Sequence, residues 1–266
     1  MPERPPPAPE NETFWREYLT RGDPSELRKR RFYRRLPREP RCRLCAAPFA
    51  GPGAPLMRMI GKRPSDTNPT LCRTCVTNLV SRRGGAEIEA TLLFADVRGS
   101  TALGERMSPD EFRRILDRFY GTATGVVFDH DGAIDKYVGD EVMAMFYPLV
   151  TGDRHASSAV AAARALLVAT GHDDPSGPWL PLGAGVETGR TWFGVVGDDR
   201  HVELTALGDV VNTTARLAAA AGPGEILVGL GAATAAGLDI SLDRRKLDLK
   251  GKREAVAAIS LRVGPG

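Results

Sequence analysis

Two aspartates occupy positions where a carboxylate can do chemistry. Asp96 ends the apolar run from Ile88 to Val97, and Asp140 lies in the stretch KYVGDEVMAMF, between two short apolar segments. The alternation on either side of this Gly-Asp pair indicates two strands joined by a tight turn. Two converging carboxylates near backbone amides bind hard divalent cations and phosphates. A turn also favours Gly and Asp for its own geometry, so the hairpin tip alone has a purely structural interpretation.

Four cysteines form a second chemical group, with Cys42 and Cys45 in CRLC and Cys72 and Cys75 in LCRTC. Each CxxC turn presents two thiolates on one side, so the two pairs together suit a tetrahedral zinc site. The segment between them has too little apolar content to fold alone, and we expect one structural Zn²⁺ per chain to stabilise it. A rubredoxin-like iron site and a redox dithiol pair are the alternatives.

The bulk composition is that of a globular protein with a basic arm. The chain has 266 residues, of which 42% are hydrophobic and 26% charged, enough for one full domain and a smaller appendage. Its net charge of +3 is unevenly placed, because arginines cluster between Arg21 and Arg43. No apolar run is long enough to span a membrane and no secretory segment follows Met1, so we expect a cytoplasmic protein without membrane contact.

The N-terminal part is organised around the cysteines. Residues 1–39 are a Pro-rich and then basic helical arm, in which Asn11 is expected to cap one helix and Asp23 to open a capping box for the next. Residues 40–80 form the four-cysteine module, and residues 81–87 (SRRGGAE) are expected to be a linker.

Residues 88–266 must position the two aspartates. A strand ending near Val97 is followed by a helix that Ser108 caps, the hairpin at 133–146, and a second helix near 155–170. Strands are expected at LPLGAGVETG and at TWFGVVG, then a helix from Asp209, a strand at EILVG and a last strand pair. The order βαββαβ predicts an α+β, ferredoxin-like fold, in which the strands carrying Asp96 and Asp140 are neighbours.

Five stretches in this region resemble the class III adenylate/guanylate cyclases in order and spacing. They are FADVRGSTAL (94–103), KYVGDEVMA (136–144), VETGRTWFGVVG (186–197), LTALGDVVNTTARLAAAAGPGEILV (204–228) and LKGKREAV (249–256). Any one of them is a weak signal, whereas the set is specific. The resemblance implies an enzyme that forms a 3′,5′-cyclic nucleotide and pyrophosphate from a nucleoside triphosphate for intracellular signalling.

The resemblance also implies a role for each matching residue. Asp96 and Asp140, with the backbone of Val97, correspond to the ligands of two Mg²⁺ or Mn²⁺ ions. The amides of Val97, Arg98, Gly99, Ser100 and Thr101 correspond to a triphosphate cradle, and Lys136 and Thr205 to the residues that recognise the purine. Asn212 corresponds to the residue that positions the ribose, and Arg216 to the one that stabilises charge at the α-phosphate. Lys250 corresponds to a residue that contacts the terminal phosphates.

Three departures from the family pattern affect the expected substrate and packing. Thr205 stands where many bacterial members have Asp; its hydroxyl can accept from the adenine 6-amino group while Lys136 donates to a ring nitrogen, which favours ATP. A hydroxyl can also donate, so the selection against GTP is soft. Ser100 replaces a frequent aromatic residue, and Thr213-Thr214 replace a more apolar pair.

The family assembles head to tail, which implies a homodimer with two shared sites. Asp96 and Asp140 would come from one protomer and the purine, ribose and arginine positions from the other.

Two other functions would use parts of this sequence. A diguanylate cyclase shares the GDE hairpin but lacks a counterpart of GDVVNTTARL. A nucleic-acid-binding regulator would use the basic arm beside the cysteine module. A solvated basic helix is the commoner meaning of such an arm.

Overall fold

The structure is a computed structural model that describes residues 9–21, 24–36, 40–42, 44–197, 202–241, 243–247 and 255–264. The chain divides into two compact units. The first unit comprises Met1–Ile88 and Trp192–Ala206, and the second comprises Glu89–Thr191 and Leu207–Gly266. The division falls beside the boundary expected at residue 88. The segment 192–206, which the sequence places in the larger domain, is part of the first compact unit.

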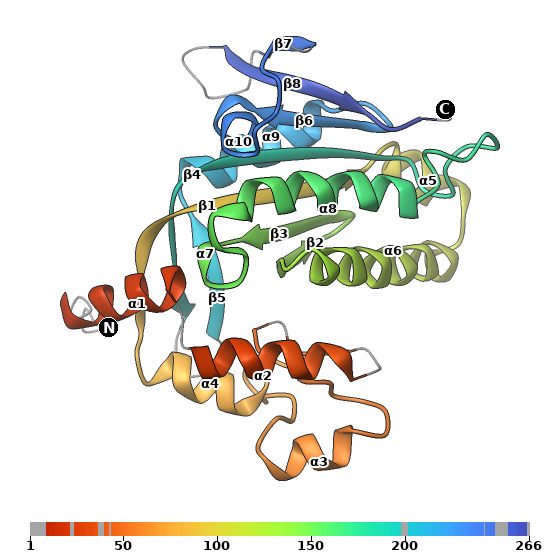
Figure 1. Cartoon of the computed structure of the whole chain (residues 1–266). Helices are drawn as coiled ribbons and strands as arrows, with labels where there is room; N and C mark the ends of the chain where they lie inside the picture. The colour runs from red at the N-terminus through yellow and green to blue at the C-terminus, as the bar shows by residue number, and fades with distance from the viewer. Residues whose placement is uncertain are drawn as a thin grey trace, which may run out of the picture. The chain divides into compact units, whose positions relative to one another are not determined.

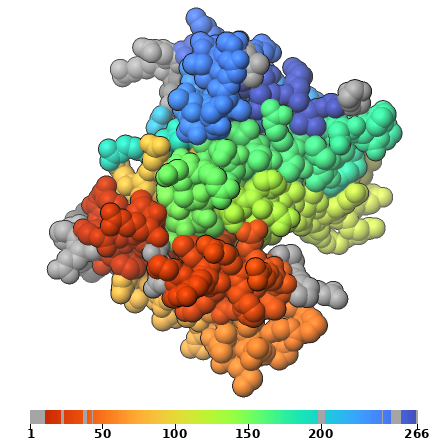
Figure 2. Space-filling view, viewed as in Figure 1, coloured from red at the N-terminus to blue at the C-terminus, as the bar shows by residue number. Residues whose placement is uncertain are grey.

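The described residues of the first unit form four helices: α1 (Pro9–Thr20), α2 (Pro24–Arg35), α3 (Ala54–Met59) and α4 (Arg73–Val80). Asn11 does not cap α1 as expected, because the helix begins before it and its side-chain amide donates to the Arg83 carbonyl at 2.9 Å. The buried Trp15 donates from its indole nitrogen to the Arg82 carbonyl at 2.7 Å. The expected capping residue Asp23 lies outside the described residues. Figure 2 shows α2 in red-orange and α3 in orange. Phe32 of α2 and Leu56 and Met59 of α3 are exposed.

Residues 84–87 are part of a strand and not of a linker. Strand β1 runs from Gly84 to Val97, and Ala86 within it is buried. A Cβ atom at Gly85 would lie 2.2 Å from the Phe193 carbonyl oxygen, so two backbones meet there at a distance that only glycine permits. The glycines that suggested a linker in the sequence therefore allow close strand packing.

From β1 onward the chain has the expected βαββαβ order, built from β1, α6 (Pro109–Asp129), β2 (Ala133–Val138), β3 (Glu141–Phe146), α8 (His155–Ala169) and β4 (Leu182–Gly197). The described residues form an eight-stranded sheet of order β2-β3-β1-β4-β6-β8-β7, with β5 (Val202–Leu207) paired to β4. The remaining strands are β6 (Glu225–Gly229), β7 (Arg244–Leu247) and β8 (Val256–Arg262). This is the predicted α+β, ferredoxin-like fold (Figure 1).

Helices cover both faces of this sheet within the second unit. On one face Leu93 and Ala95 of β1 share a core with α6 and α8, which pack on each other. On the other face Leu227 of β6 packs against Leu217 of α9 (Asp209–Ala220). Because side chains alternate along a strand, Asp96 lies on the same face as α9.

Helix α6 begins as its sequence predicts. The Ser108 hydroxyl accepts from the Glu111 amide at 3.3 Å, and the Glu111 carboxylate accepts from the Ser108 amide at 2.8 Å, which completes a capping box. Phe119, Ala123 and Val127 form its buried face. Helix α6 is yellow-green in Figure 2. Its exposed face is charged, with Arg114 paired to Asp110 at 2.6 Å.

Other elements differ from the sequence prediction. The stretch expected to form two strands is the single strand β4, which continues through Gly189. Six short helical segments within the described residues were not predicted. Two are α3 and α4 of the first unit, and the others are α5 (Ser100–Arg106), α7 (Pro148–Thr151), the 3₁₀ turn η1 (Gly152–Arg154) and α10 (Leu230–Ala235). Strand β5 was also missed.

Candidate active site and cysteine cluster

Asp96 and Asp140 are brought together by the pairing of β1 with β3. Asp96 lies opposite Glu141 in the antiparallel register, and the Val97 amide donates to the Asp140 carbonyl at 3.3 Å. Burial raises the pKa of the Asp96 carboxyl, the Arg98 guanidinium lowers it, and the charge of Asp140 raises it again. The two carboxylates are therefore close enough to repel each other, as a cation site between them requires.

Glu141 is a third carboxylate at this point and was not singled out from the sequence. Burial and the charges of Asp96 and Asp140 raise its pKa to about 7. Two features of the sequence could have identified it. It directly follows Asp140, and the short turn that forms the hairpin makes it the cross-strand neighbour of Asp96.

Two tyrosines support the hairpin tip that carries Asp140. The rings of Tyr120 on α6 and Tyr137 on β2 stack with centroids 4.3 Å apart. The Tyr120 hydroxyl donates to the carbonyl of Gly139, which has a φ of 59° at the first turn position. Glycine adopts this left-handed conformation at no steric cost, so the turn chemistry and the tyrosine together fix where Asp140 lies.

The segment expected to cradle phosphate is only partly available for that role. The Val97 amide already donates to the Asp140 carbonyl, and the Arg98 amide donates to the Pro181 carbonyl at 2.8 Å. Gly99, with a φ of 73°, precedes α5, and the first amides of a helix have no partner within it. The cradle expected over residues 97–101 therefore narrows to the amides of Gly99, Ser100 and Thr101.

Lys136 and Thr205 lie in different compact units. Lys136 is half-buried on β2, and its ammonium nitrogen is 4.0 Å from a carboxylate oxygen of the buried Asp135. Thr205 is buried on β5, where its hydroxyl lies 3.5 Å from the Ala206 carbonyl oxygen.

Asn212 and Arg216 lie one turn apart on α9, as predicted. Asn212 is exposed and Arg216 is half-buried. On the buried side of the helix, the Thr213 and Thr214 hydroxyls donate to the carbonyls of Asp209 and Val210, one turn earlier in the same helix, at 2.9 and 2.7 Å. These threonines thus satisfy their own polar groups in a position where the family more often has apolar residues. Lys250 lies outside the described residues.

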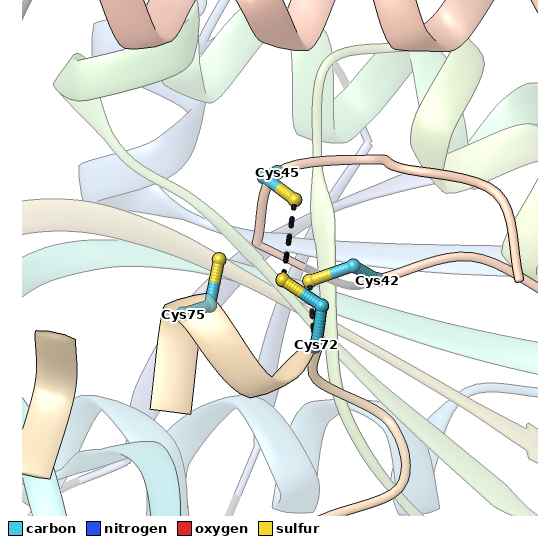
Figure 3. A group of neighbouring side chains, drawn as sticks. All are labelled: Cys42, Cys45, Cys72 and Cys75. Carbon is cyan, nitrogen blue, oxygen red and sulfur yellow. Dashed lines mark hydrogen bonds between the residues drawn. The ribbon is translucent and has the colours of Figure 1, made fainter. Parts of the chain in front are cut away.

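The four cysteines come together in the first unit (Figure 3). All four are buried, and their sulfur atoms lie within 4.8 Å of one another. The Sγ atoms of Cys45 and Cys72 are 3.8 Å apart, and the Cys72 amide donates to Cys42 Sγ at 3.2 Å. Although burial opposes it, hydrogen bonds from the other three thiols hold the pKa of Cys42 well below its usual range.

Basic side chains make contacts within the cysteine module. Lys62 is buried, and although burial opposes it, the charges of Cys45, Cys75 and Cys72 raise its pKa. Arg30 of α2 donates to the Leu44 carbonyl, and Arg41 donates to the carbonyls of Tyr33 and Leu36, so α2 is tied to the first CxxC turn. The Lys62 ammonium would offset part of the negative charge that four thiolates carry even around a divalent ion.

The sequence model described as the adenylate and guanylate cyclase catalytic domain matches residues 86–259. The chain belongs to the adenylate/guanylate cyclase family. The resemblance to class III cyclases inferred from the motifs is confirmed, and the diguanylate cyclase alternative is excluded.

Curated relatives match about half of this cyclase chain. It is 35% identical over 129 residues to "Adenylate cyclase, terminal-differentiation specific" of Dictyostelium discoideum, a match covering 47% of the chain and 6% of that protein. It is 34% identical over 134 residues to "Adenylate cyclase 1" of Rhizobium meliloti, covering 48% of the chain and 20% of the relative. The chain therefore spans a quarter or less of the length of these relatives.

Solved cyclase structures share the fold. The guanylyl cyclase Cya2 matches with a TM-score of 0.62 and 26% identity, covering 69% of this chain and 95% of that one. The adenylyl cyclase CyaB from P. aeruginosa matches with a TM-score of 0.58 and 26% identity, covering 69% and 100%. Within the described parts of the chain, no helix has the length and apolar character needed to cross a membrane.

Proposed function

We propose that this cyclase converts ATP to 3′,5′-cyclic AMP and pyrophosphate in intracellular signalling. The observation that carries the proposal is the meeting of Asp96 and Asp140 at the end of β1, beside the first turn of α5. Relatives named as adenylate cyclases support the choice of ATP. We place the reaction in the cytoplasm.

Asp96 and Asp140, with the backbone of Val97, would hold two Mg²⁺ or Mn²⁺ ions. The donor set fits such ions, because buried oxygen ligands that repel one another gain most from a hard cation. When bound, the ions would acidify the ribose 3′-hydroxyl and neutralise charge on the phosphate oxygens.

The other residues position the substrate. The amides of Gly99, Ser100 and Thr101 would donate to phosphate oxygens. Asn212 would orient the ribose so that its 3′-oxygen attacks the α-phosphorus in line, and Arg216 would meet the negative charge that develops there. Lys250 would contact the terminal phosphates.

Purine selection would rest on Lys136 and Thr205. Lys136 would donate to a ring nitrogen of adenine, and Thr205 would accept from the 6-amino group. A second candidate activity is guanylate cyclisation. The threonine hydroxyl can also donate to a 6-oxo group, and one structural neighbour is a guanylyl cyclase.

The proposed enzyme is a homodimer with two sites, each shared between protomers. One protomer would supply Asp96 and Asp140, and its partner would supply the residues that contact the purine, the ribose and the α-phosphate. A two-fold axis makes the two sites equivalent.

We propose further that Cys42, Cys45, Cys72 and Cys75 bind one structural Zn²⁺. A tetrahedral ion about 2.3 Å from each sulfur requires sulfur atoms about 3.8 Å apart, a requirement that the Cys45–Cys72 separation of 3.8 Å meets. The basic arm is proposed to pack on this module; binding of nucleic acid by the arm is the alternative, and we propose no membrane contact.

The direct test is a product assay with ATP and with GTP, each under Mg²⁺ and under Mn²⁺, resolved by chromatography. We expect cyclic AMP as the main product. Asp96→Asn and Asp140→Asn should each lose activity by more than about a hundredfold while keeping the fold, since each removes a metal ligand. Asp117→Asn, on the charged outer face of α6, is the matched control and should retain activity. Near-normal turnover in either ligand variant would disprove the two-metal assignment.

A further inference from the structure

Arg98 links the carboxylate of Asp96 to the end of helix α9. Its guanidinium contacts the Asp96 carboxylate and donates at 3.3 Å to the Asp96 main-chain oxygen. The same group donates to the carbonyls of Ala219 at 3.0 Å and Ala221 at 3.2 Å. The Arg98 backbone is itself held by the hydrogen bond that its amide donates to the Pro181 carbonyl, so the side chain extends from a fixed point.

Both ends of this link matter for the proposed reaction. Asp96 is a proposed metal ligand, and α9 carries Asn212 and Arg216. The last carbonyls of a helix have no partner within it and form its negative end, so a guanidinium there supplies missing hydrogen bonds and favourable charge. Arg98 therefore joins an element of one half-site to the helix that carries residues of the other half-site.

The pair is not a solvated surface ion pair. The Arg98 side chain is 17% exposed and the Asp96 side chain 24% exposed. A guanidinium has five donors in a planar fork, which allows one side chain to reach a carboxylate and two carbonyls together. Lysine has the charge but not the fork.

We propose that Arg98 is a positioning residue with two separable effects: it orients α9 through the Ala219 and Ala221 carbonyls, and it moderates the affinity of Asp96 for a divalent cation. The second effect follows from charge, because a cation beside a carboxylate weakens the binding of another cation to it. The metal part rests on the proposed function; the α9 part rests on the hydrogen bonds alone.

Variants of the full chain separate the two effects. Arg98→Ala removes both the charge and the hydrogen bonds. Arg98→Lys keeps the charge but cannot reach the carboxylate and the two carbonyls together. Mn²⁺ binding is followed by the electron paramagnetic resonance signal of free Mn²⁺ without nucleotide, and α9 is followed by hydrogen exchange over residues 212–224. Thiolate sites prefer softer ions, so the cysteines will not compete for Mn²⁺.

We expect Arg98→Ala to bind Mn²⁺ about twofold to fivefold more tightly than wild type, as removal of a competing cation from a partly buried pair implies. Backbone hydrogen exchange in its α9 helix should be faster, and its kcat should be about tenfold lower. Arg98→Lys should bind Mn²⁺ like wild type but share the faster exchange and the lower kcat. Arg114→Ala, which loses an exposed pair on α6, is the control and should match wild type in all three measurements.

The outcomes distinguish the failures. General unfolding would weaken Mn²⁺ binding and turnover together, so weaker or unchanged Mn²⁺ binding in Arg98→Ala overturns the metal effect. Unchanged α9 exchange overturns the positioning effect. If wild type and Asp96→Ala bind Mn²⁺ equally, the two-metal assignment fails and the metal effect with it, while the exchange measurement still decides the role at α9.

Discussion

His172 is a buried imidazole whose two nitrogens have opposite hydrogen-bonding roles. Its Nε2 accepts from the Leu182 amide at 3.2 Å. Its Nδ1 lies 3.1 Å from the Leu167 carbonyl oxygen and can donate to it. Only the neutral ring with its hydrogen on Nδ1 satisfies both partners, because a protonated ring has no acceptor for Leu182. Burial lowers the pKa of His172 accordingly.

This arrangement predicts a loss of stability in acid. A histidine whose pKa is lower in the folded state binds fewer protons there than in the unfolded chain, so stability is complete above the unfolded pKa of about 6.5 and falls as pH decreases below it. Thermal unfolding from pH 8 to pH 5.5 should show stability changing less favourably towards acid in wild type than in His172→Asn. In the same range His155, whose pKa burial also lowers, acts in the same direction as His172, whereas Glu141, whose pKa is raised to about 7, acts in the opposite direction, so the difference between the two proteins is the test. An identical slope in the variant would contradict the assignment.

Ala46 has a backbone conformation that L-residues rarely adopt. Its φ is 61°, and its amide donates to the Cys42 carbonyl at 2.8 Å in the turn of the first CxxC pair. A left-handed conformation costs a non-glycine residue about 1–2 kcal/mol.

Ala46→Gly should therefore stabilise the cysteine module, by about 1 kcal/mol at most since some packing is lost. The measurement is the denaturant concentration at which half of the zinc-loaded chain has unfolded, with unfolding detected by the accessibility of the cysteine thiols. Ala47→Gly is the matched control. Ala47 is equally buried without a positive φ, so its replacement should destabilise the module. Equal effects of the two substitutions would show that backbone strain is not the cause.

For single residues, the sequence predicted the functional side chains better than the groups that surround them. Asp96 and Asp140 were found because strand order places them together. Arg98 was identified only for its amide, whereas its amide is bound to Pro181 and its side chain makes the contacts of interest. Its partners Ala219 and Ala221 are backbone carbonyls far along the chain, and a backbone carbonyl has no signature in a residue pattern.

Among the elements, α9 is positioned by the glycines of β4. A Cβ atom at Gly185 would lie 2.3 Å from the Ala218 nitrogen and 2.5 Å from the Thr214 oxygen. A Cβ atom at Gly183 would lie 2.7 Å from the Ala221 oxygen. Backbone cannot move aside as a flexible side chain can, so these glycines set how closely the helix approaches the sheet.

Gly185→Ala should displace α9 and lower stability by about 1–3 kcal/mol, the usual cost of overpacking. Activity should fall more than stability, because Asn212 and Arg216 move with the helix. Gly121→Ala in α6 is the control: its added Cβ meets nothing within 4 Å, so it should raise helix stability by about 0.5–1 kcal/mol. Urea unfolding and turnover of both variants test this. Normal stability in Gly185→Ala would mean that the close approach is unimportant.

Glycine also explains where the predicted elements failed. The break expected in β4 was placed at the glycine of VETG, yet Gly189 continues the strand, and a Cβ there would lie 2.9 Å from a Val210 methyl carbon. The glycines at 84–85 were interpreted as a linker for the same reason. In a sequence, a glycine that permits close packing looks the same as one that permits a turn. The helix at 109–129 was predicted well because its cap and its apolar face are local signals.

For the whole molecule, the two compact units predict separate responses to metal removal. A chelator that removes metal from the four cysteines should unfold residues 40–80 and release α2, because Arg30 and Arg41 join that helix to the cluster region. The second unit has its own core and should stay folded.

Hydrogen exchange read by mass spectrometry would locate the change, and metal analysis should find about one zinc per chain. Iron with visible thiolate charge-transfer bands would instead identify a rubredoxin-like site. Cooperative loss of both units on chelation would show that the cysteine module stabilises the catalytic fold as well.

The proposed shared site gives the sharpest test of the assembly. Asp96→Ala should destroy the metal half of both sites in its homodimer, and Arg216→Ala should destroy the other half. A heterodimer of the two variants would hold one site with both lesions and one site with neither. Two inactive proteins should then recover activity when mixed.

Co-expression or shared refolding would ensure that the variants exchange. Random pairing makes about half of the dimers heterodimeric, each with one intact site of two, so activity should return to about a quarter of wild type if all dimers are equally stable. Mixing Asp96→Ala with Asp140→Ala is the control, since both lesions lie in the same half and every site in the mixture lacks a metal ligand. If heterodimers of Asp96→Ala and Arg216→Ala are isolated and remain inactive, the carboxylates and Arg216 must act within one chain, and the shared-site assembly is wrong.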